Sequence, residues 1–272
     1  MLDQPLHAVP LVFLDLETTG LYPHQGDRIC EVALQRVLGG VVETSLDRLV
    51  DPRRPLSPQS FSINRITAEH LAGAPTFAEI ADMLLTTLRG AVLVAHNAPF
   101  DLEFLYVELA LAGRPPLVNP AIDTLALARR LLPKRRSHSL AALATAAGGT
   151  PPAHRAMADV LALRVVFADL AARLTTLGIT SLSDVLRYSR GLSPGEPEPS
   201  PPQLIADALR NQRLLRIVYS SRSLPEPTER VIRPIDLTRE RGDVYLRAYC
   251  YLRQDLRAFA MAKILKIELV EE

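Results

Sequence analysis

The sequence contains few residues of the types that often mark a chemically specialised protein. It has two cysteines and no tryptophan, and only 5% of its residues are aromatic. Cys30 and Cys250 show no C-x-x-C pattern and no metal-ligand spacing, so we expect two small buried side chains rather than functional thiols. No apolar run approaches the ~20 residues of a membrane span, and the first residues lack the regions of a signal peptide. These absences predict a cytoplasmic protein with no membrane partner.

A large charge of one sign is also absent. The 272 residues carry a formal net charge of +1, so charge alone indicates no partner. Hydrophobic residues make up 48% and charged residues 22%, which is typical of globular proteins and excludes general disorder. The length predicts one or two domains with sizeable cores.

The most informative stretch is Leu11–Gly20, an apolar run that two carboxylates interrupt. In a strand, Asp15 and Glu17 project to the same side because side chains alternate with period two. Two carboxylates so close repel each other unless a cation lies between them, and hard oxygen ligands suit a divalent metal. An edge strand with a solvated acidic face is the alternative for this motif taken alone.

The first half of the chain shows alternating strand and helix patterns. Runs at about 10–17, 28–38 and 41–50 predict an antiparallel three-stranded meander, with Gly39-Gly40 as the hairpin turn. Thr76 and Glu79 have the spacing of a capping box before an amphipathic helix that ends near Leu88. The wholly apolar run 91–95 predicts a strand that is covered on both faces.

Polar groups follow this buried strand abruptly, in His96-Asn97-Ala98-Pro99-Phe100-Asp101. The carboxyl ends of strands are where ligands bind in open α/β sheets. Asp101 would lie in the first turn of a helix at about 100–112, where the helix dipole favours a carboxylate whatever its function. A short strand near 121–122 and a helix at about 123–132 follow.

A basic loop comes next, since five of the eight residues 129–136 are arginine or lysine. Such a cluster is usually a solvated surface, but beside a metal site it could hold a phosphodiester backbone. After a helix at about 138–147, His154 stands in a loop, and Asp159 lies in the early turns of a helix that runs to about 175. Four carboxylates and a histidine thus lie at the ends of predicted elements.

These residues resemble the three motifs of the DEDDh 3′-to-5′ exonuclease family, which includes the proofreading subunit of bacterial DNA polymerase III. The matching stretches are D-L-E-T-T-G at 15–20, H-N-A-P-F-D at 96–101, H-R-A-M-A-D at 154–159 and the intervening G-D-R-I-C-E-V-A at 26–33. The resemblance covers about residues 8–175 and implies an α/β, ribonuclease-H-like fold with a mixed five-stranded sheet between helices. The segment Ile63–Thr67 departs from the family pattern, in which a His-Gly pair often stands between two isoleucines.

The resemblance also implies a ligand set and a mechanism. Two Mg²⁺ or Mn²⁺ would be bound by four carboxylates, which are Asp15, Glu17, Asp101 and Asp159. His154 would act as general base, for which an imidazole with an ordinary pKa of ~6.5 is suited. Its place five residues before the last aspartate resembles the histidine branch of the family. The terminal nucleotide would be contacted by Thr18, Thr19, His96 and Asn97, whose hydroxyls and amides bind sugar and phosphate without reading sequence.

The C-terminal part begins after a Pro-rich stretch at about 191–203 that cannot form a core and reads as a linker. A helix at 204–215 and strands at about 214–220, 229–235, 243–251 and 257–269 predict a small Sm-like or SH3-like β-barrel. Residues 203–272 resemble the WYL domain of bacterial regulators, with Val244-Tyr245-Leu246 in place of the namesake tripeptide. The resemblance implies a site for nucleic acid or a nucleotide-like ligand, with candidates Arg233, Tyr245, Arg247 and Arg257; ordinary outward-facing barrel residues are the alternative.

We therefore predict an exonuclease domain at 1–175, an annex and linker at 176–202 and a WYL-like domain at 203–272. The predicted reaction is the release of nucleoside monophosphates from the 3′ end of single-stranded DNA. RNA 3′-end trimming and a catalytically silent scaffold that binds nucleic acid are the alternatives. The expected partners are single-stranded DNA or other 3′ ends, together with replication or repair proteins.

Overall fold

The computed structural model divides the chain into two compact units, Met1–Ser189 and Arg190–Glu272. It describes all residues except 1, 153, 222–225, 241, 254 and 271–272. The predicted annex and linker, 176–202, is divided between the units. One part of it, helix α8 (Leu182–Ser189), belongs to the first unit, because Leu182 and Val185 are buried in its core.

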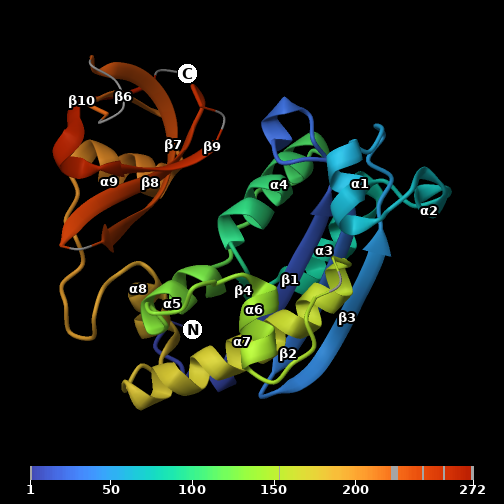
Figure 1. Ribbon diagram of the computed structural model, residues 1–272. Coiled ribbons are helices and arrows are strands. Elements are labelled where there is room, and N and C mark those ends of the chain that lie inside the picture. Colours follow the sequence, from blue (N-terminus) through green and yellow to red (C-terminus); the bar gives the residue numbers. More distant parts are fainter. Residues whose placement is uncertain (1, 153, 222–225, 241, 254, 271–272) are drawn as a thin grey trace. The chain divides into compact units, whose positions relative to one another are not determined.

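The first unit contains a five-stranded sheet with helices on both faces (Figure 1). The strand order is β3-β2-β1-β4-β5, in which β1, β2 and β3 are antiparallel and β4 and β5 run parallel to β1. The strands are β1 (Leu11–Thr18), β2 (Ile29–Leu38), β3 (Val41–Leu49), β4 (Val92–Ala95) and β5 (Ala121–Asp123). The helices are α1 (Pro58–Asn64), α2 (Ala68–Leu71), α3 (Phe77–Leu88), α4 (Ala98–Leu111), α5 (Thr124–Leu131), α6 (Leu140–Ala146) and α7 (Ala156–Thr176), with 3₁₀ turns at Leu6–Ala8 and Pro23–Gln25. The mixed sheet expected from the sequence is confirmed.

Local sequence signals account for several of these elements. Gly39 and Gly40 both adopt positive φ angles, which a tight turn between twisted strands requires, and β2 and β3 form the predicted hairpin. At the start of α3 the Glu79 carboxylate accepts a hydrogen bond from the Thr76 backbone N–H at 2.7 Å. This contact completes the predicted capping box.

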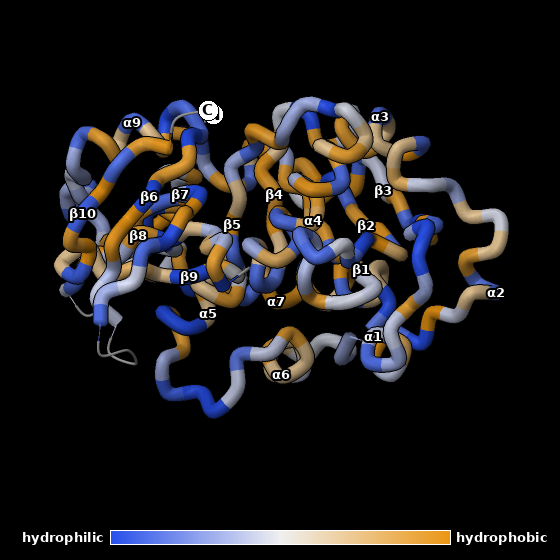
Figure 2. Tube along the Cα trace, turned by 90° about the horizontal axis from the view of Figure 1, so that it is seen from above, coloured by the Kyte–Doolittle hydropathy of each residue, from blue (hydrophilic) through white to orange (hydrophobic). Residues whose placement is uncertain are grey.

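Strand β1 separates two hydrophobic cores. Leu11 and Phe13 face one core with α5, α6 and α7, whereas Val12, Leu14 and Leu16 face the other with α3 and α4. Period-two alternation therefore places Asp15 and Glu17 on the same side as Leu11 and Phe13, toward α7. Both faces of β4 are covered, and all its residues are buried, as its apolar sequence predicts. Figure 2 shows the apolar β4 within the first unit.

The second unit is one antiparallel sheet of order β10-β6-β7-β8-β9 packed against helix α9 (Gln203–Asn211). Its strands are β6 (Leu215–Tyr219), β7 (Thr228–Glu240), β8 (Asp243–Cys250), β9 (Asp255–Ala260) and β10 (Ile264–Leu269), with a 3₁₀ turn at Met261–Lys263. In the described part of the unit no pairing of β9 with β10 closes the sheet, so a closed barrel is not confirmed.

Three details of this unit differ from the sequence prediction. The helix ends at Asn211 because Gln212 adopts a left-handed conformation with φ of 53°. The second predicted strand, 229–235, extends to Glu240, since a register shift between Pro234 and Asp236 lets the ladder continue past a proline that cannot donate a hydrogen bond. The run 257–269 is two strands, β9 and β10, which the 3₁₀ turn separates.

Among the described residues we find no helix that combines the length and the apolar character needed to cross a lipid bilayer.

Candidate active site with a carboxylate cluster

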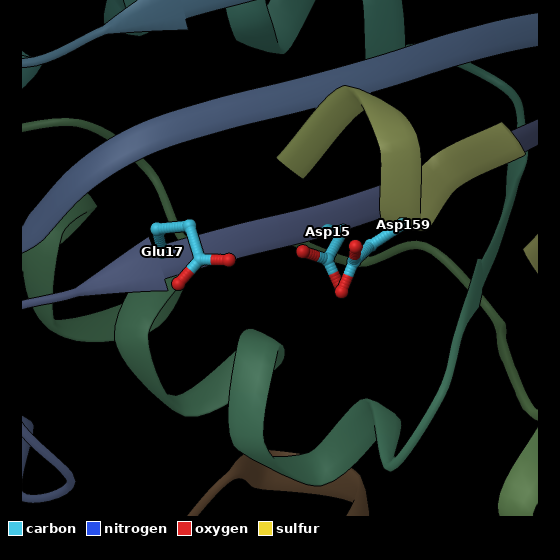
Figure 3. A group of neighbouring side chains, drawn as sticks. All are labelled: Asp15, Glu17 and Asp159. Carbon is cyan, nitrogen blue, oxygen red and sulfur yellow. The ribbon is translucent and has the colours of Figure 1, made fainter. Parts of the chain in front are cut away.

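Three of the four predicted metal ligands meet at the end of β1. Oxygen atoms of Asp15, Glu17 and Asp159 all lie within 4.8 Å of one another. Figure 3 shows the Asp15 and Asp159 carboxylates side by side, with Glu17 farther along β1. Asp159 comes from the first turn of α7, which crosses the face of the sheet toward which Asp15 and Glu17 point. This set of hard oxygen donors fits a divalent cation.

Asp101, the fourth predicted ligand, lies in the first turn of α4, directly after β4, and is 4% exposed. It is not part of the three-residue oxygen cluster, but its charge acts on that cluster. Burial raises the pKa of Asp15 well above its usual value, and the charges of Asp101, Asp159 and Glu17 raise it further. All four predicted carboxylates therefore contribute to one electrostatic site.

Glu17 shows most clearly that this arrangement disfavours the ionised form of its carboxylates. Burial raises its pKa to about 7, and the charge of Asp159 adds to the effect, while a hydrogen bond from Asn64 and the charge of Arg155 oppose it. Burial also raises the pKa of Asp101, with Asp123 adding to the rise. A proton that Glu17 holds near neutral pH would be displaced by a bound cation.

His154, the predicted general base, is exposed and lies immediately before α7 with a φ of 53°. A left-handed conformation is uncommon for a residue other than glycine, although histidine is among those that adopt it more often. The conformation turns the chain sharply into the helix that carries Asp159. His154 thus lies on the segment that leads into the first turn of α7, which carries Asp159.

The contact that holds the start of α7 against the sheet was not predicted from the sequence. Glu31 on β2 is 1% exposed, and its two oxygens accept hydrogen bonds from the Arg155 guanidinium at 2.6 to 3.1 Å and from the Ala156 N–H at 3.0 Å. We call this contact the Glu31–Arg155 clamp. A lone acidic residue within the apolar run Ile29–Leu34 was the available sequence signal, because a buried carboxylate needs a partner.

The clamp gives a prediction for stability. Replacing Arg155 by glutamine leaves the buried Glu31 carboxylate with only one of its present donors, so we expect a loss of about 1–3 kcal/mol in the free energy of unfolding. Arg173→Gln removes an exposed i,i+4 pair with Asp169 and should cost less than about 0.5 kcal/mol. Chemical denaturation of both variants measures the difference. Equal losses would mean that the clamp contributes no more than a surface ion pair.

The predicted nucleotide contacts are placed unequally. Thr19 is fully buried; its hydroxyl donates to Asp27 at 3.1 Å and accepts from the Arg28 N–H at 3.0 Å. The hydroxyl of Thr18 donates to the Gly20 carbonyl at 2.6 Å. Both hydroxyls therefore hold the loop after β1 in its present form, and their contact with a nucleotide stays a prediction.

Gly20 makes that loop possible, because a Cβ atom at this position would lie 2.2 Å from the Asp27 carboxylate. Asp27 also accepts a hydrogen bond from the Tyr22 N–H at 3.0 Å. Only a residue without a side chain allows Asp27 to bind both ends of the loop.

His96 and Asn97 lie where the sequence predicted, directly after β4. The half-buried His96 ring contacts the Thr124 hydroxyl at 2.9 Å and the His138 carbonyl at 3.0 Å. Asn97 is exposed and adopts a φ of 70°, and its backbone N–H donates to Asp123 at 2.9 Å. The side chain of Asn97 remains accessible at the edge of the site.

Comparison with known proteins identifies the first unit. The sequence pattern of the exonuclease family (RNase_T) matches residues 12–167. The chain belongs to this exonuclease family. The pattern of the WYL domain matches residues 203–269. Both resemblances noted in the sequence are thereby confirmed, and the exonuclease match includes all four carboxylates and His154.

Two relatives support the assignment. The chain is 38% identical over 193 residues to a "DNA polymerase III subunit epsilon-like protein" of Rhodobacter capsulatus, which covers 69% of this chain and 27% of that protein. It is 37% identical over 184 residues to a "DNA polymerase III PolC-type" of Thermotoga maritima, covering 67% of this chain and 13% of that one. The chain thus spans about a quarter or less of the length of these relatives.

Solved structures agree with the exonuclease fold. Exonuclease X in complex with 5′ overhanging duplex DNA is 29% identical, with a TM-score of 0.50 over 65% of this chain and 99% of that one. The nuclease domain of 3′hExo, a DEDDh family member bound to rAMP, is 19% identical with a TM-score of 0.52 over 65% of this chain and 97% of that one. The second likeness concerns the fold alone.

The predicted site of the WYL-like domain is divided between the two faces of its sheet. Tyr245 and Arg247 alternate with buried residues of β8, and Arg247 forms an ion pair with Asp236 across the ladder. Arg233 lies opposite Tyr249 in the register of β7 and β8. Its guanidinium carbon is 5.8 Å from the centre of the Tyr249 ring. Arg257 instead pairs with Ala248, so strand alternation puts it on the opposite face from Arg247.

Proposed function

We propose that the protein is a metal-dependent 3′-to-5′ exonuclease that releases nucleoside monophosphates from single-stranded DNA. The observation that carries the proposal is the cluster of Asp15, Glu17 and Asp159 oxygens within 4.8 Å, with Asp101 in electrostatic contact. A mutually repelling group of buried carboxylates is costly unless cations bind to it. A scaffold protein without nuclease activity would gain nothing from keeping these repelling carboxylates together.

Two Mg²⁺ or Mn²⁺ ions would be held by Asp15, Glu17, Asp101 and Asp159. When bound, such ions lower the pKa of water and stabilise charge on phosphate oxygens. The other tasks belong to the chain itself. His154 accepts the proton of the attacking water, and its exposed position leaves it able to pass that proton to solvent. The Glu31–Arg155 clamp fixes the helix start that carries His154 and Asp159.

DNA is favoured over RNA by the names of the similar proteins. The relatives with 38% and 37% identity are designated as DNA polymerase III proteins, and the solved exonuclease at 29% identity is bound to DNA. The 3′-exonuclease structure bound to rAMP is 19% identical and supports only the fold. Partners among replication and repair proteins stay a prediction of the sequence.

For the second unit we propose a Sm/SH3-like domain that binds nucleic acid or a nucleotide-like ligand on the face that carries Arg233, Tyr245 and Arg247. Its support is the WYL match and a cavity of about 470 Å³ that Tyr245 lines together with Tyr219 and Lys263, although Arg233 and Arg247 do not line it. Aromatic rings and a lysine suit stacking and phosphate contact. Arg257 would act separately, since it lies on the other face.

A digestion experiment tests the exonuclease proposal. A single-stranded DNA labelled at its 5′ end should give a ladder that shortens by single nucleotides with Mn²⁺ and stays intact with EDTA. The same strand in RNA should be cut more slowly. Release of mononucleotides from the 5′ end, or no release from either strand at saturating Mn²⁺, would reject the proposal.

The acidic cluster also predicts how stability depends on pH without metal. Since the pKa values of Asp15 and Glu17 are raised in the folded state, the unfolded chain releases these protons first as pH increases. Stability should therefore fall from about pH 4, the ordinary carboxylate range, to about pH 7, where Glu17 ionises in the folded protein.

Mn²⁺ should remove this decrease, because the cation binds the ionised cluster of the folded state. Thermal denaturation at pH 5 and pH 8, with EDTA or Mn²⁺, measures both effects, and the rise in midpoint with Mn²⁺ should be larger at pH 8. A rise in midpoint that is equal at the two pH values would argue against a site built from raised-pKa carboxylates.

A further inference from the structure

The last turn of α5 and the loop that joins α5 to α6 carry several exposed basic residues close together in the chain. Lys134, Arg135 and Arg136 are exposed, as is Arg129 in the last turn of α5. Within the part of the chain that the structure describes, none of these four side chains forms an ion pair. Figure 2 shows the segment between α5 and α6 as hydrophilic. We call these four residues the basic loop.

Two arginines elsewhere in this unit are neutralised. Arg114 pairs with Asp82 at 2.7 Å, and Arg173 pairs with Asp169 at 2.9 Å. An unpaired cluster is electrostatically costly, because like charges raise one another's energy. The absence of carboxylate partners around the basic loop leaves its charge available for an anionic ligand.

The basic loop is attached directly to the edge of the active site. The His138 carbonyl, two residues after Arg136, contacts the His96 ring at 3.0 Å. At the other end of α5, Thr124 contacts the same ring, and Asp123 binds the backbone N–H of Asn97. Two residues of extended chain span at most about 7 Å, so Arg136 cannot lie far from His96.

The electrostatics agree with this placement. Burial lowers the pKa of His96, and the positive charge of Arg129 lowers it further, against the opposing charge of Asp123. Arg129 therefore acts on the residue that stands at the carboxyl end of β4. His96 follows β4 directly, and β4 runs parallel to β1, so this residue lies at the same edge of the sheet as the end of β1 that carries Asp15 and Glu17.

A strand of nucleic acid is the anion that fits this arrangement. The carboxylate cluster would take only the terminal phosphodiester, so the phosphates farther along the strand need cations outside that cluster. Arginine forks bind phosphate oxygens in pairs, and such contacts position a strand without reading its sequence. Lys134 and Arg136 are separated by at most about 7 Å of extended chain, and their long side chains add to this reach, so together they can contact more than one phosphate.

We propose that the basic loop binds the phosphates of the nucleic acid strand next to its terminal nucleotide and so determines how firmly the strand is held. This inference rests on the proposed exonuclease function and assigns that site a strand-binding surface. It predicts that strand binding, but not the metal site, depends on these four charges.

The test removes three of the charges by Lys134→Gln/Arg135→Gln/Arg136→Gln in the full-length chain. Binding of a fluorescent oligodeoxythymidylate is measured against salt concentration in an Asp15→Asn background, which prevents digestion. The slope of log K against log salt is negative, and each lost phosphate contact on single-stranded DNA reduces its magnitude by about 0.7. We expect the magnitude of the slope to decrease by about 2 and binding at low salt to weaken more than tenfold.

A matched control removes the same charge from the far end of the unit. Arg89, Arg114 and Arg173 lie before β4, after α4 and in the last turn of α7, at the ends opposite His96, Asp101 and Asp159. Changing all three to glutamine should leave the slope as it is. Equal decreases for the two triple variants, or an unchanged slope for the loop variant, would overturn the proposal.

A second assay separates this inference from the proposed function. It measures hydrolysis of the nitrophenyl ester of thymidine monophosphate with Mn²⁺ by proteins that retain Asp15. No ester hydrolysis by the otherwise unaltered protein would reject the exonuclease function. If the loop variant loses strand binding much more than ester turnover, the loop acts on the strand. Parallel losses of the two would mean that the loop only supports His96, and would overturn the proposal.

Discussion

Asp15→Asn is expected to abolish strand digestion and, in the absence of metal, to stabilise the protein. Asp15 lies among three other acidic groups, and the charges of Asp101, Asp159 and Glu17 all raise its pKa. Asparagine has the same shape but cannot supply an anionic oxygen to a cation. Divalent ions bound there would contribute several kcal/mol to the reaction, so we expect a loss on the order of 10³-fold or more in turnover.

The opposite sign of the stability effect makes this prediction specific. Removing one of several repelling carboxylates relieves the cluster when no cation compensates it, so the thermal midpoint in EDTA at pH 8 should rise. With Mn²⁺ the unaltered protein should gain more than the variant does. Asp169→Asn, a change at a half-exposed position of α7, is the control for both measurements. Retained digestion by Asp15→Asn, or a lower midpoint in EDTA, would contradict the assignment of the cluster.

His154→Asn should reduce turnover by about 10²–10⁴-fold and change substrate binding little, as expected for the loss of a general base. Asparagine suits the left-handed backbone at this position, where φ is 53°, so the change should not disturb the chain before α7. Its amide cannot accept the proton of the attacking water. Single-turnover digestion and strand-binding titrations measure the two effects separately.

Rescue by added imidazole distinguishes proton transfer from positioning. His154 is exposed, so a small base can reach the vacated position in a His154→Gly variant, which the left-handed backbone also accepts. We expect imidazole to restore part of the turnover of that variant and none of the turnover of Asp15→Asn. His7→Asn, an exposed histidine in the 3₁₀ turn Leu6–Ala8, should behave like the unaltered protein. A loss confined to binding would show that His154 holds the substrate instead.

Much of the first unit could be predicted because its signals are local. Period-two alternation places Asp15 and Glu17 on one side of β1, and two adjacent glycines with positive φ form the β2–β3 turn. The same reasoning failed for the run 257–269. A β-rich composition does not show where one strand stops, and here the 3₁₀ turn Met261–Lys263 divides it.

The active-site residues were located through their motifs, but the contacts between them were not. Nothing in the sequence states that Glu31 binds Arg155, since the two are far apart in the chain and either could have been a solvated charge. The same holds for Thr19, whose hydroxyl is used by Asp27 and Arg28. Strand register likewise separates Arg257 from Arg247. The register partner of Arg247 is Ala258, and Arg257, one residue earlier on that strand, points to the opposite face.

The amino-acid sequence alone predicted the family, the succession of strands and helices up to α7, and the residue types available for metal binding and proton transfer. These follow from short-range periodicity and from motifs that chemistry restricts to few residue types. The packing of these elements was needed to show that Asp159 meets Asp15 and Glu17, that burial raises the pKa of Glu17 to about 7, and that the basic loop adjoins His96. Distance and desolvation depend on how elements pack, and these quantities have no local signature in the chain.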